Sequence, residues 1–214
     1  RVVRPRLYKE PQYSSTCKFF VIVVSRDRCF ECVNSLFDTA HAPQQVRVAV
    51  MSYGHPPTIR KHQVICRRYT QREYTNDMSA HADAMRYYSG EAYILYLNEM
   101  CVLLPRWDDI LSNYTTSSTA VSGSTKPSFS IVRNGKIVRR QMVSPTAPVN
   151  TIYANTACLC TTRPVSFGKS SRWHTVYATD QLRRANIRPI SLHIPVIFKY
   201  TIPRFREGQR SNRT

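Results

Sequence analysis

The chain has 214 residues, of which 42% are hydrophobic, so it can bury a full core and form a folded domain, which argues against a disordered chain. No apolar run approaches the roughly 18–20 residues that a membrane-spanning helix needs, so we expect no membrane partner. The 31 Lys and Arg residues outnumber the 13 Asp and Glu residues and give a net charge of +18. This excess favours a polyanionic partner.

The positive charge is concentrated in the second half of the chain. Residues 110–214 hold 16 of the basic residues but only 2 of the acidic ones. Arginine accounts for 24 of the 31 basic residues, and its planar guanidinium makes bidentate contacts with phosphate. A surface that served solubility alone would mix the two signs of charge. We therefore expect RNA rather than DNA as the partner, with a generally basic surface as the alternative.

The first part of the chain predicts alternating strands and helices. Residues 1–16 are basic and contain proline, which indicates an extended arm. Residues 18–25 form a continuous β-branched run typical of a buried strand. Residues 29–39 have apolar side chains at helical spacing, and residues 45–51 alternate as a second strand. A strand, a helix and a strand in this order imply a parallel pair.

The middle of the chain predicts the strand on which a ligand site would depend. Residues 63–68 indicate a third strand, and residues 76–88 indicate a helix that stops before Gly90. Residues 93–97 are a short apolar run that predicts a buried central strand. It ends at the polar triplet Asn98-Glu99-Met100, which places that triplet at the carboxyl edge of the sheet, where ligands bind in open α/β sheets.

A hairpin is predicted after the central strand. Residues 107–111 indicate a short helix, and residues 112–126 a Ser- and Thr-rich loop. Asn134-Gly135 lies between two alternating runs, 128–133 and 136–142, which is a strong signal for a type I′ hairpin. Its basic residues are typical of a finger that contacts phosphate. An edge hairpin protected by charges is the alternative.

The last third predicts shorter elements and a basic tail. Residues 152–161 indicate a strand, residues 179–185 a short helix, and residues 190–200 a strand interrupted by Pro195. The tail is basic and polar. The expected organisation is an arm at 1–16, an α/β domain at 17–203 and a tail at 204–214.

The seven cysteines form an odd set without a regular disulfide framework. Several lie inside apolar stretches, where cysteine behaves as a small hydrophobic residue, so we expect a reducing compartment. Cys29-x-x-Cys32 and Cys158-x-Cys160 hold enough thiolates for a zinc ion. The two pairs are far apart in sequence, and the second has the spacing of one strand face, so we expect no zinc site.

Several short motifs occur in the order in which a known family has them. They are Ser25-Arg26-Asp27 after the first strand, Ala40-His41-Ala42-Pro43, the segment 88–95 (YSGEAYIL), Trp107-Asp108, and residues 158–167. Together they resemble the GlcNAc-transferase family that modifies hydroxyproline on cytoplasmic proteins. The similarity spans roughly residues 18–205 and depends on the collinear order of the motifs.

This resemblance implies an α/β fold of GT-A type, related to the Rossmann fold. Its mixed, mostly parallel central sheet would be flanked by helices, with the hairpin as an addition. It also implies a divalent metal ion that neutralises the leaving nucleoside diphosphate, held by oxygen or imidazole ligands. The family's D-x-H motif falls on Asn98-Glu99-Met100. Asn98 is a weak neutral ligand, the Met100 thioether is too soft for Mg²⁺ or Mn²⁺, and Glu99 points to the opposite side if the strand continues through it.

Two further departures from the family pattern concern the remaining ligand positions. The later acidic pair falls near Asp180, which leaves one carboxylate, and a late ligand histidine falls on Lys199. An ammonium group cannot bind a cation. With Asp27 in the opening motif, these positions form a degenerate site, so we expect no metal, no cofactor and no catalysis. Metal-free transfer in which Lys199 replaces the charge of the metal is the alternative.

The adjacent carboxylates Asp108 and Asp109 suggest acid–base chemistry at first sight. Adjacent residues on a helix diverge by about 100°, so we expect them to stabilise the start of a helix instead. The six histidines show no metal-binding spacing.

The sequence therefore predicts a non-catalytic, RNA-binding component of a large ribonucleoprotein, a mitochondrial ribosome in the mitochondrial matrix. Its partners would be ribosomal RNA and neighbouring ribosomal proteins. The alternatives are an active nucleotide-sugar-dependent transferase that moves GlcNAc to protein, and a pseudoenzyme scaffold that binds acidic proteins or an anionic membrane. The expected RNA contacts are Arg4, Arg6, Arg133, Lys136, Arg139, Arg140, Arg183, Arg184, Arg188, Arg204, Arg206 and Arg210.

Overall fold

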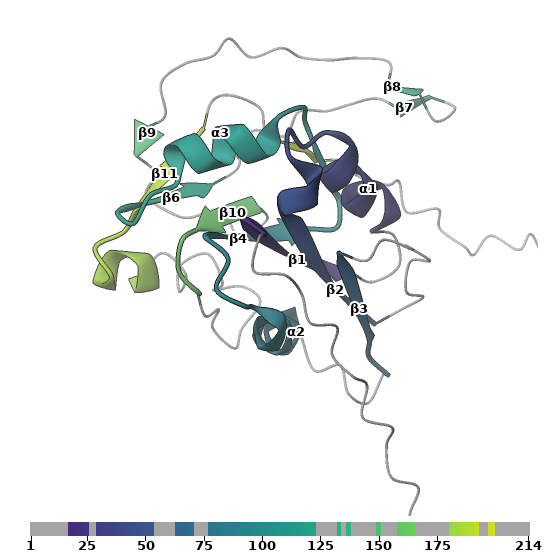
Figure 1. Cartoon of the computed structure of the whole chain (residues 1–214), viewed down its shortest axis with the longest axis horizontal. Coiled ribbons are helices and arrows are strands. Elements are labelled where there is room, and N and C mark those ends of the chain that lie inside the picture. Colours follow the sequence, from purple (N-terminus) through teal and green to yellow (C-terminus); the bar gives the residue numbers. More distant parts are fainter. Residues whose placement is uncertain are drawn as a thin grey trace, which may run out of the picture.

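The computed structural model describes residues 17–25, 29–53, 63–70, 77–122, 132–133, 136–137, 149–150, 158–165, 180–192 and 197–199. Their centre is an eight-stranded sheet with helices on both faces (Figure 1). In spatial order its strands are β3 (Val64–Arg68), β2 (Val46–Ser52), β1 (Phe19–Ser25), β4 (Tyr93–Asn98), β10 (Cys158–Thr161), β6 (Thr119–Ser122), β11 (Arg188–Ser191) and β9 (Val149–Asn150).

The sheet is mixed but mostly parallel. All its strands run in one direction except β10 and β9. Two small sheets accompany it. In one, β12 (Ile197–Lys199) pairs with β5 (Cys101–Leu103), and in the other β7 (Val132–Arg133) pairs with β8 (Lys136–Ile137). The predicted fold class is confirmed, and the antiparallel pairing of β7 with β8 agrees with the predicted hairpin.

The central strands are buried on both faces, which explains their continuous apolar runs. Phe19, Val21 and Val23 of β1 pack on the face that carries α1 (Phe30–Asp38) and α3 (Trp107–Tyr114). Phe20 and Ile22 pack on the opposite face with α2 (Asp77–Ala84). The molecule therefore has three layers, with α1 and α3 above the sheet and α2 below it in Figure 1.

Helix α1 is joined to β5 and α3 by hydrogen bonds between side chains and backbone groups. The Ser35 hydroxyl donates to the Cys32 carbonyl at 2.7 Å and accepts the Leu103 backbone N–H at 2.9 Å. The Trp107 indole N–H donates to the Leu36 carbonyl at 3.1 Å. Since these groups are buried, each unmade bond would carry a desolvation penalty, and the bonds hold α1, β5 and α3 together as one block.

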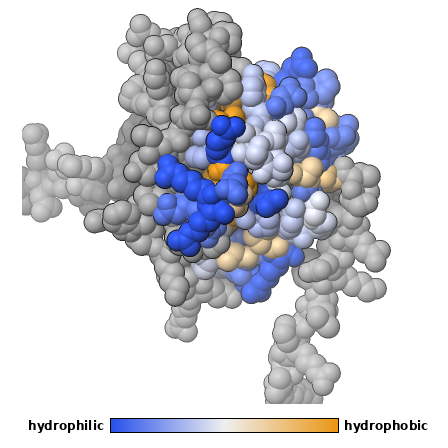
Figure 2. Space-filling view, turned by 90° about the vertical axis from the view of Figure 1, so that its left-hand side faces the viewer, coloured by the Kyte–Doolittle hydropathy of each residue, from blue (hydrophilic) through white to orange (hydrophobic). Residues whose placement is uncertain are grey.

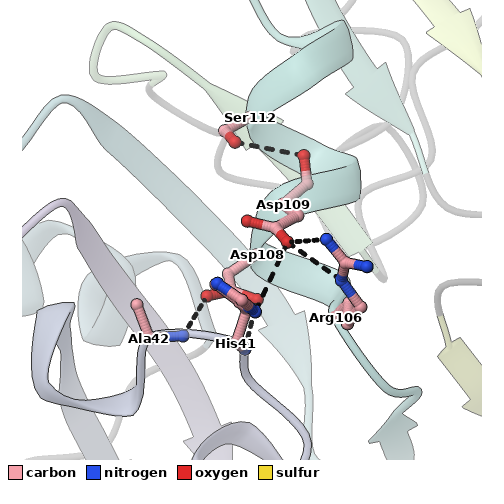
Figure 3. A network of polar contacts seen from close by, with 6 residues as sticks. All are labelled: His41, Ala42, Arg106, Asp108, Asp109 and Ser112. Carbon is pink, nitrogen blue, oxygen red and sulfur yellow. Dashed lines mark hydrogen bonds and ion pairs between the residues drawn. The ribbon is translucent and has the colours of Figure 1, made fainter.

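The two adjacent aspartates at the start of α3 have different partners (Figure 3). The buried Asp108 carboxylate accepts the backbone N–H groups of His41 and Ala42 at 2.8 and 2.9 Å. Asp109 accepts a bidentate contact from Arg106, and this hydrogen bond lowers the pKa of Asp109. Asp108 therefore holds the loop after α1 in place. This role adds to the predicted stabilisation of the start of a helix.

A buried ion pair fixes the connection that leads into β4. Arg47 of β2 lies 2.6 Å from Glu91, and both side chains are almost fully buried. Arg47 also donates to the Ser89 hydroxyl at 3.1 Å and to the Tyr87 carbonyl, and its guanidinium lies 5.1 Å from the centre of the Phe20 ring. Such a pair is tolerated inside a protein because both charged groups also make hydrogen bonds, those of Arg47 to Ser89 and Tyr87 and that of Glu91 to the Ser89 backbone N–H.

Two predicted elements differ from the structure. The predicted loop at 112–126 is wrong, because α3 extends to Tyr114 and β6 follows at Thr119–Ser122. Its sequence TAVS is too short and too polar to give a strand signal, yet β10 and β11 pair with it on both sides. The single strand predicted at 190–200 is also wrong, since β11 and β12 are separate strands in different sheets.

Several predictions fall outside the described residues. The arm at 1–16, the tail at 204–214 and most of the hairpin lie there. Within the part of the chain that the structure describes, no helix is long and apolar enough to cross a membrane.

We predict that Arg47→Met destabilises the protein by about 3–5 kcal/mol, because it leaves the buried Glu91 carboxylate without its charge partner. The matched control is Arg86→Met. Arg86 pairs with Asp83 at 3.3 Å, but its side chain is 72% exposed, so we expect a loss of about 1 kcal/mol or less. Urea unfolding followed by circular dichroism measures both. Equal losses in the two variants would contradict the prediction.

Candidate functional site

The strand order places a topological switch point beside β1. The chain passes from β1 to β2 to β3 on one side, and then crosses to β4 on the other side of β1. Crossover connections leave in opposite directions at such a point, which opens a crevice outside the carboxyl ends of the two central strands. Here those ends are Ser25 of β1 and Asn98 of β4. The region outside these two strand ends, called the crevice below, is the candidate functional site.

A carboxylate bridges the two strand ends. Strand β4 stops at Asn98, the chain reverses, and β5 begins at Cys101. The Asn98 side chain accepts the Met100 backbone N–H at 2.9 Å, which stabilises this reversal. Glu99 accepts the Ser25 hydroxyl at 2.7 Å. The expectation that Glu99 points away fails because the strand does not continue through it.

Two neutral thiols lie under this bridge. The Cys32 thiol donates to the Asn98 carbonyl at a sulfur–oxygen distance of 3.7 Å. Burial raises the pKa of Cys32 well above its usual value, and burial raises the pKa of Cys29 to about 11. Since the thiolate is the reactive form, neither cysteine is a nucleophile near neutral pH. Their role at the site is to pack α1 against it.

Lys199 is brought to this turn from a distant part of the sequence. In the antiparallel pair of β12 and β5, Lys199 lies opposite Cys101. Paired residues in such a ladder have Cα atoms about 4.5–5.5 Å apart. Lys199 thus lies beside the residue that follows the reversal at Glu99 and Met100.

The other residues of the predicted degenerate site are not brought together in this way. Asp180 is exposed at the start of the helical segment 180–184, which leads into β11, three strands from β4 in the sheet. None of the contacts among the described residues joins Asp180 to Asn98. Asp27 lies outside the described residues.

The predicted RNA contacts are only partly described. Arg183, Arg184 and Arg188 are exposed. Arg133 and Lys136 face each other in the pairing of β7 with β8. The remaining predicted contacts lie outside the described residues: Arg4, Arg6, Arg139, Arg140, Arg204, Arg206 and Arg210.

The donor atoms that the structure describes at the crevice do not fit a divalent metal ion. Glu99 supplies one carboxylate, and the Asn98 amide oxygen already accepts the Met100 N–H. The Met100 thioether is too soft for Mg²⁺ or Mn²⁺. Among the described residues, no group of three His, Cys, Asp or Glu side chains is arranged to hold a metal. None of the four cysteines in the pairs considered for zinc forms a disulfide.

The fold is shared with solved glycosyltransferases. S. aureus TarS, residues 1–349, superposes with a TM-score of 0.57 at 15% identity over 86% of this chain and 60% of TarS. GalNAc-T7, solved with UDP, GalNAc and Mn²⁺, superposes with a TM-score of 0.54 at 9% identity over 88% of this chain and 45% of GalNAc-T7. Both are GT-A glycosyltransferases.

The chain therefore has a GT-A fold. It spans 60% and 45% of the lengths of these two proteins. No protein-family model matches it, and no curated protein matches it either.

The prediction that the protein is not an enzyme is corrected by these similarities, because the solved proteins that share its fold are glycosyltransferases. The prediction relied on the missing D-x-H ligands and set Glu99 aside because it would point to the opposite side of a continuing strand. One feature of the sequence could have indicated that Glu99 lies at the edge of the sheet. A polar triplet followed by a second apolar run at Cys101 is compatible with a tight reversal, and a reversal returns Glu99 to the edge of the sheet.

We predict that iodoacetamide at pH 8 labels Cys66, which is exposed, much faster than Cys29 in the native protein. A pKa of about 11 for Cys29 reduces its thiolate fraction roughly 100-fold relative to an ordinary thiol. Peptide mass spectrometry measures both rates, and labelling in 6 M guanidinium is the control in which the difference disappears. Equal native rates would refute this description of the thiols.

Proposed function

We propose that this protein is a nucleotide-sugar-dependent glycosyltransferase that acts at the crevice outside the carboxyl ends of β1 and β4. The observation that carries the proposal is the Glu99 carboxylate, which the Ser25 hydroxyl holds at the switch point of a GT-A fold. Its position there is the one at which open α/β sheets bind ligands. The similarity to TarS and GalNAc-T7 supports the same class of reaction.

The chemistry requires one proton acceptor at this crevice. An acceptor hydroxyl forms a bond to the anomeric carbon of the sugar while the bond from that carbon to the diphosphate oxygen breaks. The electron pair of the broken bond leaves with the nucleoside diphosphate, and the hydroxyl proton must go to a base. We assign this role to the Glu99 carboxylate, which is only partly buried. Ser25 is a positioning residue, because its hydrogen bond orients that carboxylate.

The motif resemblance supports a more specific proposal for the donor and the acceptor. We propose UDP-GlcNAc as the donor and a protein hydroxyl group, that of hydroxyproline, as the acceptor. The side of the crevice formed by β1, β2 and β3 would take the nucleotide, since the carboxyl ends of these three parallel strands meet there. Arg68 ends β3 on that side and is exposed.

We predict that Glu99→Gln lowers the rate of sugar release from radiolabelled UDP-GlcNAc by about 100-fold or more, because the amide cannot accept the proton. Ser25→Ala should lower the rate by a smaller factor, since the carboxylate remains but loses its orientation. The control Asp109→Asn removes a carboxylate that pairs with Arg106 at the start of α3 and does not bridge the crevice. Absence of hydrolysis or transfer with a panel of UDP- and GDP-sugars would reject the proposed function.

A second proposal concerns RNA. We propose that the basic second half binds ribosomal RNA, with a mitochondrial ribosome in the mitochondrial matrix as the expected location. Three exposed arginines support it, Arg183, Arg184 and Arg188. Arg188 begins β11, at the edge of the sheet opposite the crevice. Figure 2 shows strongly hydrophilic side chains gathered on the side of the molecule that carries this segment. Binding of RNA there leaves the crevice accessible.

We predict that replacing Arg183, Arg184 and Arg188 together by Gln weakens binding to a ribosomal RNA fragment and reduces the slope of log K against log salt by about two to three, because fewer phosphate charges are neutralised. The matched control replaces Arg86 and Arg106 by Gln, since both are exposed but already paired with aspartates. Filter binding across a salt series measures the slope. An unchanged slope in the triple variant would exclude this surface.

A further inference from the structure

We propose that the surface between the end of β3 and helix α2 binds a terminal phosphate group, held between the guanidinium groups of Arg67 and Arg86. This surface lies on the face of the sheet that carries α2, below the sheet in Figure 1. The crevice lies outside the ends of β1 and β4. The proposed phosphate site is therefore separate from the transferase chemistry, and it can be tested without it.

The two guanidinium groups converge on one carboxylate, that of Asp83 in α2. The Nη2 atom of Arg86 lies 3.3 Å from Oδ1 of Asp83, and the Nη2 atom of Arg67 lies 3.7 Å from Oδ2. The Oδ2 atom also accepts the Tyr69 hydroxyl at 3.0 Å. Arg67 comes from β3, and Arg86 comes from the short helix η2 (Met85–Tyr87) that follows α2. Two distant segments thus bring their positive charges to one point of the surface.

Asp83 does not saturate these two cations. Each guanidinium has several N–H donors, but each approaches Asp83 through Nη2 alone, and the 3.7 Å separation at Arg67 is too long for a hydrogen bond. Two arginines face a single aspartate, so the cluster keeps one uncompensated positive charge. The Arg86 side chain is 72% exposed and the Arg67 side chain is 34% exposed. An anion from solvent can therefore reach both guanidinium groups.

An aromatic ring holds Arg67 in position. The Arg67 guanidinium lies 5.0 Å from the centre of the Tyr69 ring, an arrangement in which the ring attracts the cation. Tyr69 is itself buried, and its hydroxyl is bound to Asp83. A side chain that is already ordered loses less conformational freedom when it binds a ligand. The site is thus arranged for an anion before any anion binds.

The charge of the cluster favours a terminal phosphate over a carboxylate. Asp83 already supplies a carboxylate from within the chain, so an external carboxylate has no advantage in competing for the same arginines. A terminal phosphate carries about two negative charges and has three free oxygen atoms. Guanidinium groups bind such oxygen atoms in pairs. A terminal phosphate can therefore bridge Arg67 and Arg86 from the solvent side.

The position of Arg68 argues against a nucleic acid at this point. A nucleic acid presents a row of phosphates and is bound by a row of cations. Arg68 is the next residue of β3 and is exposed, but alternation along a strand directs it to the face opposite Arg67. Among the described residues, the basic side chains that meet at Asp83 are those of Arg67 and Arg86. They form a single point of charge, which fits one anionic group.

The test measures binding of inorganic phosphate and of a phosphoserine peptide to the full chain by isothermal titration calorimetry, with the unphosphorylated peptide as the reference. Arg67→Gln combined with Arg86→Gln should raise the dissociation constant roughly 10- to 100-fold, the range expected for loss of hydrogen bonds to a charged group. Asp83→Asn should lower it by roughly twofold to fivefold, because the variant removes a negative charge that competes for both arginines in an exposed ion pair.

Arg68→Gln is the matched control for general charge. It removes an exposed arginine from the same strand, but one that alternation directs away from Asp83, so phosphate binding should not change. Circular dichroism shows whether each variant is folded. If the double variant does not fold, Arg86→Gln alone provides the test, because the Arg86 side chain is mostly exposed and its loss should still weaken phosphate binding.

The outcomes also identify the source of the phosphate. Tighter binding of the phosphopeptide than of inorganic phosphate indicates a phosphorylated protein, and binding of inorganic phosphate at least as tight indicates a free phosphate compound. Absence of phosphate binding overturns the proposal. So does equal binding of the unphosphorylated peptide, equal weakening by Arg68→Gln, or unchanged binding in the variants of Arg67 and Arg86. An RNA fragment that displaces phosphate and is lost in the same variants assigns the cluster to RNA and also overturns it.

Discussion

The reversal of the chain at Glu99 and Met100 is the constraint on which the candidate site depends. If β4 continued for two more residues, alternation would send Glu99 and its neighbours to opposite faces of the sheet. Because the strand ends at Asn98, the Glu99 carboxylate reaches Ser25 on β1, and β5 runs back alongside α1. The same reversal creates the edge on which β12 pairs. One turn thus determines both the position of the Glu99 carboxylate and the pairing of β12 with β5.

Local patterns were sufficient to predict the elements in the first half of the chain. The β-branched run of β1, the helical spacing in α1 and the alternation in β2 each depend on neighbouring residues, so their burial follows from the sequence itself. The parallel order of these strands follows from the strand–helix–strand rule. The mostly parallel sheet could therefore be predicted without knowledge of any distant contact.

The contacts that build the site could not be predicted in that way, because they join distant residues. Ser25 and Glu99 are 74 positions apart, and Lys199 meets Cys101 across nearly half the chain. Strand β6 has only the polar-flanked sequence TAVS and becomes a strand because both neighbours offer it hydrogen bonds. The sequence also does not indicate that the buried Asp108 binds the loop after α1, since its partners there are backbone groups.

The two edges of the sheet carry different kinds of charge arrangement. At the amino edge, Arg47 and Glu91 neutralise each other in the interior, and this pair fixes the entry into β4 without presenting charge to solvent. At the carboxyl edge, Glu99 is only partly buried and is bound to a neutral hydroxyl. A charge pair buried in the interior serves stability, whereas a carboxylate that is only partly buried can be reached by a substrate. This contrast is the structural reason to locate the chemistry at the carboxyl edge.

The large net charge of the chain does not by itself remove the need for a positioned cation. A positive surface raises the local concentration of an anion such as a nucleoside diphosphate. At physiological ionic strength this attraction is screened over about 8 Å, so arginines at the far edge of the sheet cannot stabilise charge that develops at one oxygen atom. Stabilisation of a leaving group requires a donor already fixed at that atom. The pairing of β12 with β5 brings the backbone of one basic residue, Lys199, next to Cys101, which follows the turn at Glu99 and Met100.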